Sequence, residues 1–247
     1  MSVKMSIVIP FHNESANITP LIKKTDEVLT HMQISYEIVA VDDASSDDTY
    51  KILQDLTNSF PSLKVFHHHN NCGQSTSVVT GVRNAKGDLI ATLDGDGQNN
   101  PEDIPNLYKA LLNSNNPNLK MVAGYRKERK DTIFKRWGSK FANSIRSRLL
   151  KDATPDTGCG LKLFHREIFL KLPYFDHMHR FLPALVQREG ADVISVEVSH
   201  FPRVYGKSHY NNLQRLWVGI IDLIGVMWLI RRSFKPKITQ YKVNNIF

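Results

Sequence analysis

Residues 89–104 read LIATLDGDGQNNPEDI, and this stretch decides the fold. An apolar run of strand type stops at two aspartates, Asp94 and Asp96, and a Pro-Glu-Asp helix start follows at Pro101. In an extended strand end, residues i and i+2 point the same way, so both carboxylates are expected to reach one ion. Gly95 and Gly97 permit close approach of the backbone to a ligand. Three chemistries use such a pair: calcium binding, phosphate-ester hydrolysis, and binding of a metal against a diphosphate.

The spacing of the following residues separates these three chemistries. An EF-hand loop that starts at Asp94 needs Gly at its sixth position and Glu at its twelfth, but Asn99 and Pro105 stand there. The Asp-x-Asp motif of haloacid-dehalogenase-like phosphatases normally opens the chain and continues Gly-Thr, whereas here it follows the fourth predicted strand and continues Gly-Gln. A solvated turn with helix-capping acids is the structural alternative. Magnesium or manganese, held by hard oxygen ligands and sharing a diphosphate, is the favoured interpretation.

Apolar runs and helical patterns alternate along the first half of the chain. The patterns predict strands at 4–10, 36–43, 63–69, 88–94 and 119–125, and helices at 15–32, 46–56, 74–85 and 101–113. Near-continuous apolar strands separated by helices predict an α/β fold, with a mostly parallel sheet flanked by helices on both faces.

Three of the predicted strands end in acidic residues. Ligands of open parallel sheets bind at the carboxyl ends of strands, so these side chains should converge on one crevice. They are Glu14, Asp42, Asp43, Asp94 and Asp96. The chain has neither G-x-G-x-x-G nor a P-loop, so neither of these nucleotide-binding motifs applies.

The second half of the chain is less regular. Residues 132–150 predict a basic helix, with three interpretations: a face for a lipid phosphate, a nucleic-acid face, or a solvated surface. A glycine-rich turn at 156–160 leads into a strand, residues 180–190 predict a short helix, and 191–201 predict a strand. The histidines at 67–69 alternate faces and indicate a strand end rather than a metal site. Cys159 is interpreted as a small packing residue.

Composition narrows the class of partner. The 247 residues suffice for one substantial domain, and the formal net charge of +8 favours anionic partners such as nucleic acid, acidic lipid headgroups or phosphorylated substrates. The two cysteines form no framework and are compatible with a reducing compartment. The N-terminal apolar stretch is too short for a signal peptide, because Pro10 interrupts it early.

Residues 216–230, LWVGIIDLIGVMWLI, form an unusually apolar segment. As a helix it spans roughly 22 Å, short of the ~30 Å hydrocarbon core of a bilayer. It is either a buried core helix or a helix that lies in a membrane or on a membrane partner. The flanking arginines and lysines and two tryptophans suit an interface. Gly219, Asp222 and Gly225 share one side, which predicts a close-packed face there.

Several motifs together resemble glycosyltransferase family 2. They are PFHNE (10–14), VDDASSDDT (41–49), GDLIATLDGDGQNNPEDI (87–104), AGYR (123–126), DTGCGLKLFHRE (156–167), RFLPAL (180–185) and FPRVYGKSHY (201–210). The most similar subgroup comprises the dolichol-phosphate mannosyltransferases and bacterial polyprenyl-phosphate glycosyltransferases. The resemblance covers about residues 4–210 and implies the GT-A nucleotide-sugar-binding fold.

The resemblance also implies roles for individual residues. Those that would line the nucleotide pocket are Pro10, His12 and Glu14, with Val41 and Asp43 at the base, where Asp43 would accept a base N–H. Those that would contact the Mg²⁺ or Mn²⁺ ion, the ribose and the diphosphate are Asp94, Asp96 and Gln98, with Gly95 between them. Those that would meet phosphate groups are Arg126 and Arg203 on the donor, Arg136 and Ser139 on the acceptor lipid, and His209. The family usually has Tyr at position 12 and often Lys at position 209.

These observations predict a GT-A catalytic domain at 1–210, followed at 211–247 by an apolar helix and basic tail that associate with a membrane or a partner. The predicted activity is inverting transfer of a sugar from a nucleotide-sugar donor to a polyprenyl phosphate, with Asp96, Arg126 and Arg203 as the catalytic groups. The protein is expected at the cytoplasmic membrane face, held by a membrane surface or an integral membrane partner, without nucleic acid. Transfer to a glycan or lipid A-type acceptor, or a non-catalytic nucleotide-sugar-binding subunit, are the alternatives.

Overall fold

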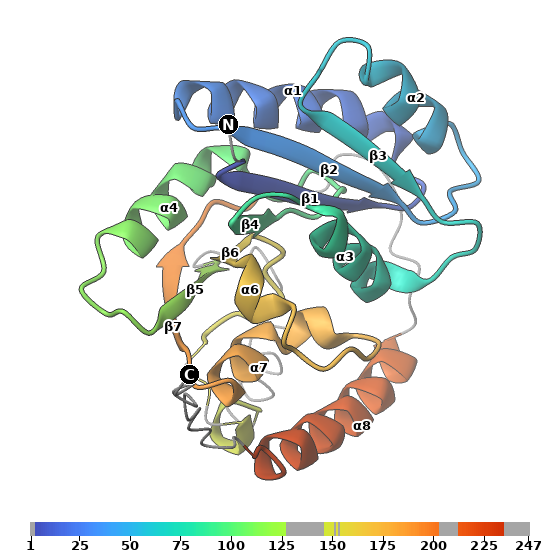
Figure 1. The fold of residues 1–247 in the computed structure, drawn as a ribbon. Coiled ribbons are helices and arrows are strands. Elements are labelled where there is room, and N and C mark those ends of the chain that lie inside the picture. The colour runs from blue at the N-terminus through green and yellow to red at the C-terminus, as the bar shows by residue number, and fades with distance from the viewer. Residues whose placement is uncertain (1–2, 127–145, 151, 153, 203–211, 235–247) are drawn as a thin grey trace, which may run out of the picture.

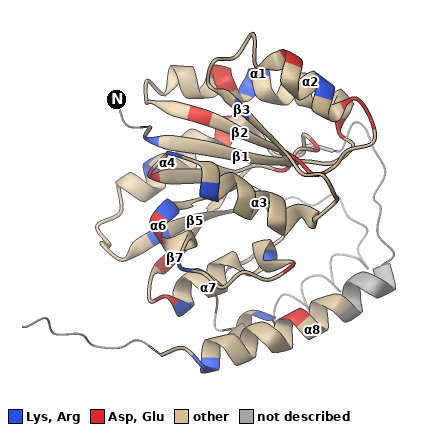
Figure 2. Ribbon diagram, turned by 45° about the vertical axis from the view of Figure 1, so that its right-hand side comes forward, with Lys and Arg blue, Asp and Glu red and all other residues tan. Residues whose placement is uncertain are grey.

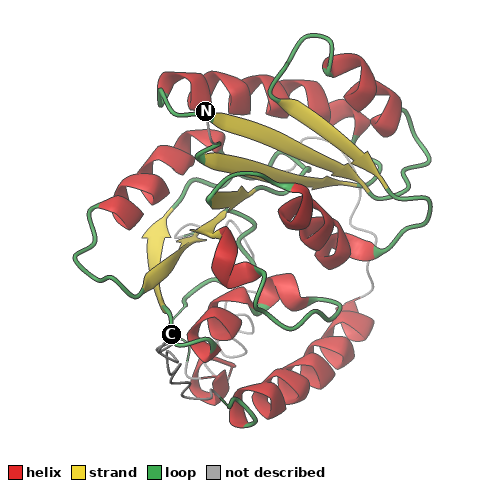
Figure 3. Cartoon of the chain, viewed as in Figure 1, coloured by secondary structure: helices red, strands yellow, loops and turns green. Residues whose placement is uncertain are grey.

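A computed structural model describes residues 3–126, 146–150, 152, 154–202 and 212–234 (Figure 1). Within this part of the chain, seven strands form one sheet in the order β3-β2-β1-β4-β6-β5-β7 (Figure 3). The strands are β1 (Met5–Phe11), β2 (Tyr36–Asp42), β3 (Leu63–His67), β4 (Leu89–Thr92), β5 (Leu119–Tyr125), β6 (Lys162–His165) and β7 (Asp192–Glu197).

The sheet is mostly parallel, as the sequence predicted. β1 pairs in parallel with β2 and β4, β2 with β3, and β5 with β7. β6 is the exception, because it lies antiparallel between β4 and β5. The strand pattern of the first half predicted β4 and β5 but contained no sign that a later strand separates them.

Helices cover both faces of the sheet, which confirms the predicted fold class. Ile7 and Ile9 of β1 pack into one core and Val8 into the other, so this strand is apolar throughout. The first core lies under α1 (Ser15–His31), α2 (Thr49–Leu56) and, after η1 (Pro101–Asp103), α4 (Ile104–Leu112). The second lies under α3 (Gly73–Asn84), α6 (Arg166–Phe169) and, after η2 (Met178–Arg180), α7 (Leu182–Arg188).

The apolar segment forms α8 (Asn212–Arg231), which runs along the second core (Figure 1). Val226 is fully buried there, with Leu223, Met227 and Ile230 partly buried around it. Arg188 of α7 donates its Nε–H to the carbonyl oxygen of Leu229 at 3.1 Å. One side of α8 therefore packs into the second core, as the interpretation of this segment as a core helix expected.

The glycines of α8 do not make the close-packed face that their spacing suggested. In the part of the chain that the structure describes, a Cβ atom added at Gly219 or at Gly225 would meet no atom within 4 Å outside its own helix backbone, so the predicted close packing at these glycines is wrong for this part. Asp222, on the predicted face, lies instead 3.2 Å from Nδ1 of His177. Larger apolar side chains make the packing contact, because they bury more surface. Among the described residues, no helix has both the length and the hydropathy needed to cross a bilayer.

Candidate active site at the carboxyl edge of the sheet

One edge of the sheet collects the ends of six strands and the beginning of the seventh. β1, β2, β3 and β4 run in parallel and end there. The antiparallel β6 starts there, with Lys162 opposite Thr92, and β5 and β7 again end there. This topology places the acidic strand ends at one edge of the sheet, and the convergence of their side chains on one crevice stays a prediction.

Asp94 and Asp96 lie in a tight turn rather than in an extended strand end. β4 ends at Thr92, two residues earlier than the apolar run suggested. Asn99 accepts the Asp94 N–H at 2.9 Å, and Asp96 Oδ1 accepts the Gln98 N–H at 3.1 Å. The alternation of side chains along a strand therefore does not explain how the two carboxylates come together. They are close because both lie in the same turn.

Gly95 has a packing role in this turn. A Cβ atom there would lie 2.5 Å from the carbonyl oxygen of Pro10 and 2.7 Å from the ring of Phe11. Gly95 is also buried, so its close approach is to β1 rather than to a ligand. Gly97 has φ +72°, a conformation that glycine adopts without steric cost.

The Asp94 carboxyl is poised for a cation. Burial and the neighbouring charge of Asp96 raise its pKa to about 6, against the opposing effects of Lys162, Arg126 and a hydrogen bond from Gln74. Gln74 Nε2–H donates to Asp94 Oδ1 at 2.8 Å. Two carboxylates crowded together in this way gain stability when a divalent ion neutralises them. The residues therefore fit Mg²⁺ or Mn²⁺, both of which prefer hard oxygen ligands.

Arg126 follows β5 and is held by Asp156. Its Nε–H and Nη2–H donate to the two carboxylate oxygens at 2.6 Å and 3.0 Å, a bidentate pair in which both side chains are about nine-tenths buried. Lys162, at the start of β6, is almost fully buried and donates to the carbonyl oxygen of Cys159. Burial lowers the Lys162 pKa, while the charges of Asp94 and Asp156 oppose this shift.

Asp156 and Lys162 belong to the motif DTGCGLKLFHRE, but the sequence alone indicated no function for either residue. The pattern that could have indicated a function is the placement of Asp156 and Lys162 on either side of Gly158 and Gly160. Cys159 is fully buried, and burial raises its thiol pKa, which supports its interpretation as a packing residue.

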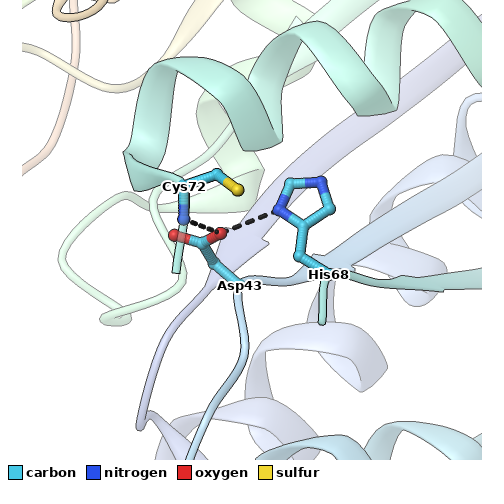
Figure 4. Close-up of side chains that lie close together, drawn as sticks. All are labelled: Asp43, His68 and Cys72. Atoms are coloured by element: carbon cyan, nitrogen blue, oxygen red, sulfur yellow. Dashed lines mark hydrogen bonds and ion pairs between the residues drawn. The ribbon is translucent and has the colours of Figure 1, made fainter. Parts of the chain in front are cut away.

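Asp43 closes a second cluster, shown in Figure 4 with His68 and Cys72. Its carboxylate accepts the backbone N–H groups of Cys72 and Gly73 at the start of α3, at 2.8 Å and 2.7 Å. His68 Nδ1 lies 2.7 Å from Asp43 Oδ1, and its Nε2 lies 2.9 Å from Thr80 Oγ1. Within the described residues these bonds fill three of about four acceptor positions of the Asp43 carboxylate and leave one on Oδ2.

These three residues also form the only group of three His, Cys, Asp or Glu ligand atoms within 4.8 Å of one another in the described part of the chain. Both ring nitrogens of His68 are engaged in hydrogen bonds, so the group is a closed network rather than an open metal site. His67 likewise pairs with Asp42, at 2.7 Å.

The other residues predicted to bind the donor nucleotide differ in how far they are buried. His12 Nδ1 lies 2.8 Å from the carbonyl oxygen of Asp43, and Glu14 accepts a 2.7 Å hydrogen bond from Asn17. Both are partly exposed, as is Pro10. Val41 is fully buried in the second core, so its side chain does not reach the edge where the other residues gather.

The predicted residues on the phosphate side fall largely outside the described residues. These are Arg136, Ser139, Arg203 and His209. The backbone N–H of Phe201 donates to the carbonyl oxygen of Gln98 at 3.0 Å, and Gln98 Nε2 donates to Phe201 O at 3.4 Å. The chain segment before Arg203 is thus bonded to the Asp94–Gln98 turn.

Comparison with known families decides the class. Residues 6–172 match the family described as Glycosyl transferase family 2. This chain belongs to glycosyl transferase family 2. The ordered motifs predicted this membership, and it is confirmed.

Relatives of this family 2 chain include polyprenyl-phosphate sugar transferases. It is 31% identical over 239 residues to dodecaprenyl-phosphate galacturonate synthase of Rhizobium johnstonii, covering 95% of this chain and 70% of that protein. It is 32% identical over 212 residues to undecaprenyl-phosphate 4-deoxy-4-formamido-L-arabinose transferase of Proteus mirabilis, covering 85% of this chain. The chain spans 64% of the length of that second relative.

Solved structures show the same fold at lower identity. Glucosyl-3-phosphoglycerate synthase of Mycobacterium tuberculosis, in complex with Mn²⁺, UDP and phosphoglyceric acid, aligns with TM-score 0.68 and 16% identity, covering 94% of this chain and 80% of that one. A mannosyltransferase of Pyrobaculum calidifontis, in complex with GDP-Man and Mn²⁺, aligns with TM-score 0.66 and 20% identity, covering 96% and 66%. The family 2 chain therefore has a GT-A-like fold, with a mostly parallel sheet between helices.

Proposed function

We propose that this family 2 chain is an inverting glycosyltransferase that moves a sugar from a nucleotide-sugar donor to a polyprenyl phosphate at the cytoplasmic face of a membrane. The observation that carries the proposal is the meeting of Asp94, Asp96 and Arg126 at the carboxyl edge of the sheet. The names of the relatives, which are polyprenyl-phosphate sugar transferases, support the acceptor class.

Asp94, Asp96 and Gln98 would hold Mg²⁺ or Mn²⁺, which supplies neutralising charge for a diphosphate when bound. Asp156 engages Nε and Nη2 of Arg126, and Nη1 would donate to a departing diphosphate oxygen. Asp43 offers its remaining acceptor position to a base N–H, and His12 and Glu14 lie on the neighbouring loop. Arg203 would add a second cation at the diphosphate.

The acceptor chemistry needs no strong base. A lipid phosphate is already anionic at neutral pH, so one of its oxygens attacks the anomeric carbon as the bond to the nucleoside diphosphate breaks. The protein's main task is to hold the two in line and to stabilise the leaving diphosphate. Arg136 and Ser139 are proposed to hold the acceptor phosphate, and His209 a further phosphate contact.

Membrane association is proposed for the outward side of α8. Ile221, Ile224 and Trp228 are exposed by 66%, 62% and 60%, at helical spacing opposite the buried Val226. Figure 2 shows an acidic residue part-way along α8, then an uncharged stretch, and basic residues at the C-terminal end, which suit anionic headgroups. In this proposal residues 1–210 are the catalytic domain and 211–247 the associating segment.

The test is transfer from a panel of nucleotide sugars to a short polyprenyl phosphate, with Mn²⁺, Mg²⁺ or chelator. We expect transfer from at least one donor, its loss with chelator, and a loss of at least about a hundredfold in Asp96→Asn. Asp55→Asn, an exposed carboxylate on α2, is the matched control and should retain full activity. Folded, metal-loaded protein that transfers no sugar from any donor would contradict the proposal and favour a non-catalytic subunit.

A further inference from the structure

The segment Asp156–Lys162 reaches the site from a distant part of the chain. The segment leads into β6, which begins at Lys162. Because β6 is antiparallel to β4 and β5, the beginning of β6 lies where those two strands end. Thr92 Oγ1–H donates to the carbonyl oxygen of Gly160 at 2.6 Å, and the Gly124 N–H donates to that of Leu161 at 2.9 Å. The segment is therefore bonded to both neighbouring strands.

Gly160 lies directly against the Asp94 carboxylate. A Cβ atom at this position would be 2.1 Å from Asp94 Oδ2 and 2.5 Å from Oδ1, well inside contact distance. The hydrogen bond from Thr92 restrains the backbone at Gly160, and Gln74 on α3 donates to Asp94 Oδ1. The absence of a side chain at position 160 therefore defines the space in which the Asp94 carboxylate lies.

Asp156 sets the orientation of Arg126. Besides the bidentate pair, Asp156 Oδ2 accepts the backbone N–H of Arg126 at 3.3 Å, so one carboxylate fixes both the main chain and the guanidinium. A planar guanidinium bound along one edge by two parallel hydrogen bonds has little freedom to rotate, which directs its remaining N–H groups.

Lys162 carries a positive charge that balances the negative charges of Asp94 and Asp156. It is 3% exposed, and both Asp94 and Asp156 act on it electrostatically. Its hydrogen bond to Cys159 O closes the turn that carries Gly160. A buried ammonium group is tolerated only with such compensation.

Resting on the proposed function, we propose that the Asp156–Lys162 segment is the positioning element of the donor site. Gly160 fixes the Asp94 carboxylate for the metal, and Asp156 fixes the Arg126 guanidinium for the diphosphate. Neither residue touches the reacting atoms; each acts through the side chain that it holds.

The first measurement is calorimetric titration of the metal-free full chain with Mn²⁺ alone. Gly160→Ala should weaken Mn²⁺ binding by about tenfold or more, because the added methyl group would displace the Asp94 carboxylate, and disturbing the surroundings of a metal ligand has an effect of this size. Gly81→Ala is the matched control, because it adds the same methyl group in an equally tight place, 2.4 Å from Val8 Cγ1 in the apolar core, where it meets none of the charged groups of the site. It should leave Mn²⁺ affinity unchanged.

The second measurement is titration of the Mn²⁺-saturated protein with UDP and GDP. Asp156→Asn should weaken binding of the nucleoside diphosphate by about tenfold while Mn²⁺ affinity in its absence stays within about threefold. In an Arg126→Ala background the same substitution should have no further effect, because its influence passes through the guanidinium. Thermal unfolding of each variant identifies general loss of structure.

The two proposals fail in different ways. If the wild-type chain binds neither Mn²⁺ nor a nucleoside diphosphate, the proposed function is wrong. If it binds both, and Gly160→Ala retains Mn²⁺ affinity or Asp156→Asn retains nucleotide affinity, the positioning inference is wrong. Equal loss of both affinities in both variants would also contradict it, because the inference assigns one ligand to each residue.

Discussion

Replacing Asp94 with Asn should stabilise the metal-free protein at neutral pH, and the gain should vanish in acid. Burial and the charge of Asp96 raise the Asp94 pKa from 3.8 to about 6 in the folded protein. The folded state therefore binds this proton more tightly than the unfolded chain. The resulting stability is fully present below pH 3.8 and is lost as the pH rises through about 6.

The size of the effect follows from the shift. A shift of about two pKa units corresponds to about 3 kcal/mol at pH values above both constants. Asp94 faces the open edge of the sheet and is partly exposed, so solvent screening should reduce the gain to about 1–3 kcal/mol. Asn keeps the shape of the side chain and an oxygen acceptor for Gln74.

Urea unfolding in chelator, repeated between about pH 4.5 and pH 8, measures this gain. The difference between Asp94→Asn and wild type should grow through this range, while the Asp55→Asn control should differ from wild type by no more than about 0.5 kcal/mol. Added Mn²⁺ should stabilise the wild type and not the variant, which reverses their order. A variant no more stable than wild type at about pH 8, or a gain independent of pH, would refute this account of the site.

Three further predictions concern parts of the chain outside the metal turn. Gly81→Ala places a methyl carbon 2.4 Å from Val8 Cγ1 and should cost about 1–3 kcal/mol in urea unfolding, with Mn²⁺ affinity unchanged; a neutral effect would show that α3 can shift. The double substitution Ile221→Ser and Ile224→Ser should lower co-sedimentation with anionic vesicles at unchanged melting temperature, and unaltered vesicle binding would exclude this side of α8 as the membrane contact. Burial opposes ionisation of Glu37, but hydrogen bonds from Lys64, the Lys86 backbone and Ser6 outweigh it and lower the Glu37 pKa below 4.5. The stabilisation is present above pH 4.5 and is lost as the pH falls through the folded value, so Glu37→Gln should cost about 1–3 kcal/mol at neutral pH and less at about pH 3, and equal costs at both would contradict the assigned charge.

Local pattern was sufficient for much of the fold. The apolar runs of β1 and β2 are buried on both faces, and this double burial is the property that their composition reports. The helix start at Pro101 was also predicted from the sequence. In the structure Asn100 caps this start by accepting the Glu102 N–H at 3.2 Å. The predicted close-packed glycine face of α8 was wrong because glycines that share a side of a helix permit a close approach but do not show that another part of the chain makes one.

The sequence likewise predicted part of the candidate site. The family motifs and the acidic strand ends of the sequence placed Asp43, Asp94 and Arg126 at one edge of a parallel sheet. The roles assigned to Arg136, Ser139, Arg203 and His209 stay predictions, because these residues lie outside the described part of the chain.

The sequence by itself determined the alternation of strands and helices, the family, and the acidic edge, because each depends on residues close together in the chain. Only the tertiary structure decided that β6 enters antiparallel between β4 and β5. That insertion brings Gly160 against Asp94 and Asp156 against Arg126, contacts that bridge 66 and 30 residues (160 − 94 and 156 − 126). Side-chain periodicity carries no information about which distant strands pair. The groups that hold the metal ligand and the guanidinium in place therefore became visible only once the chain was folded.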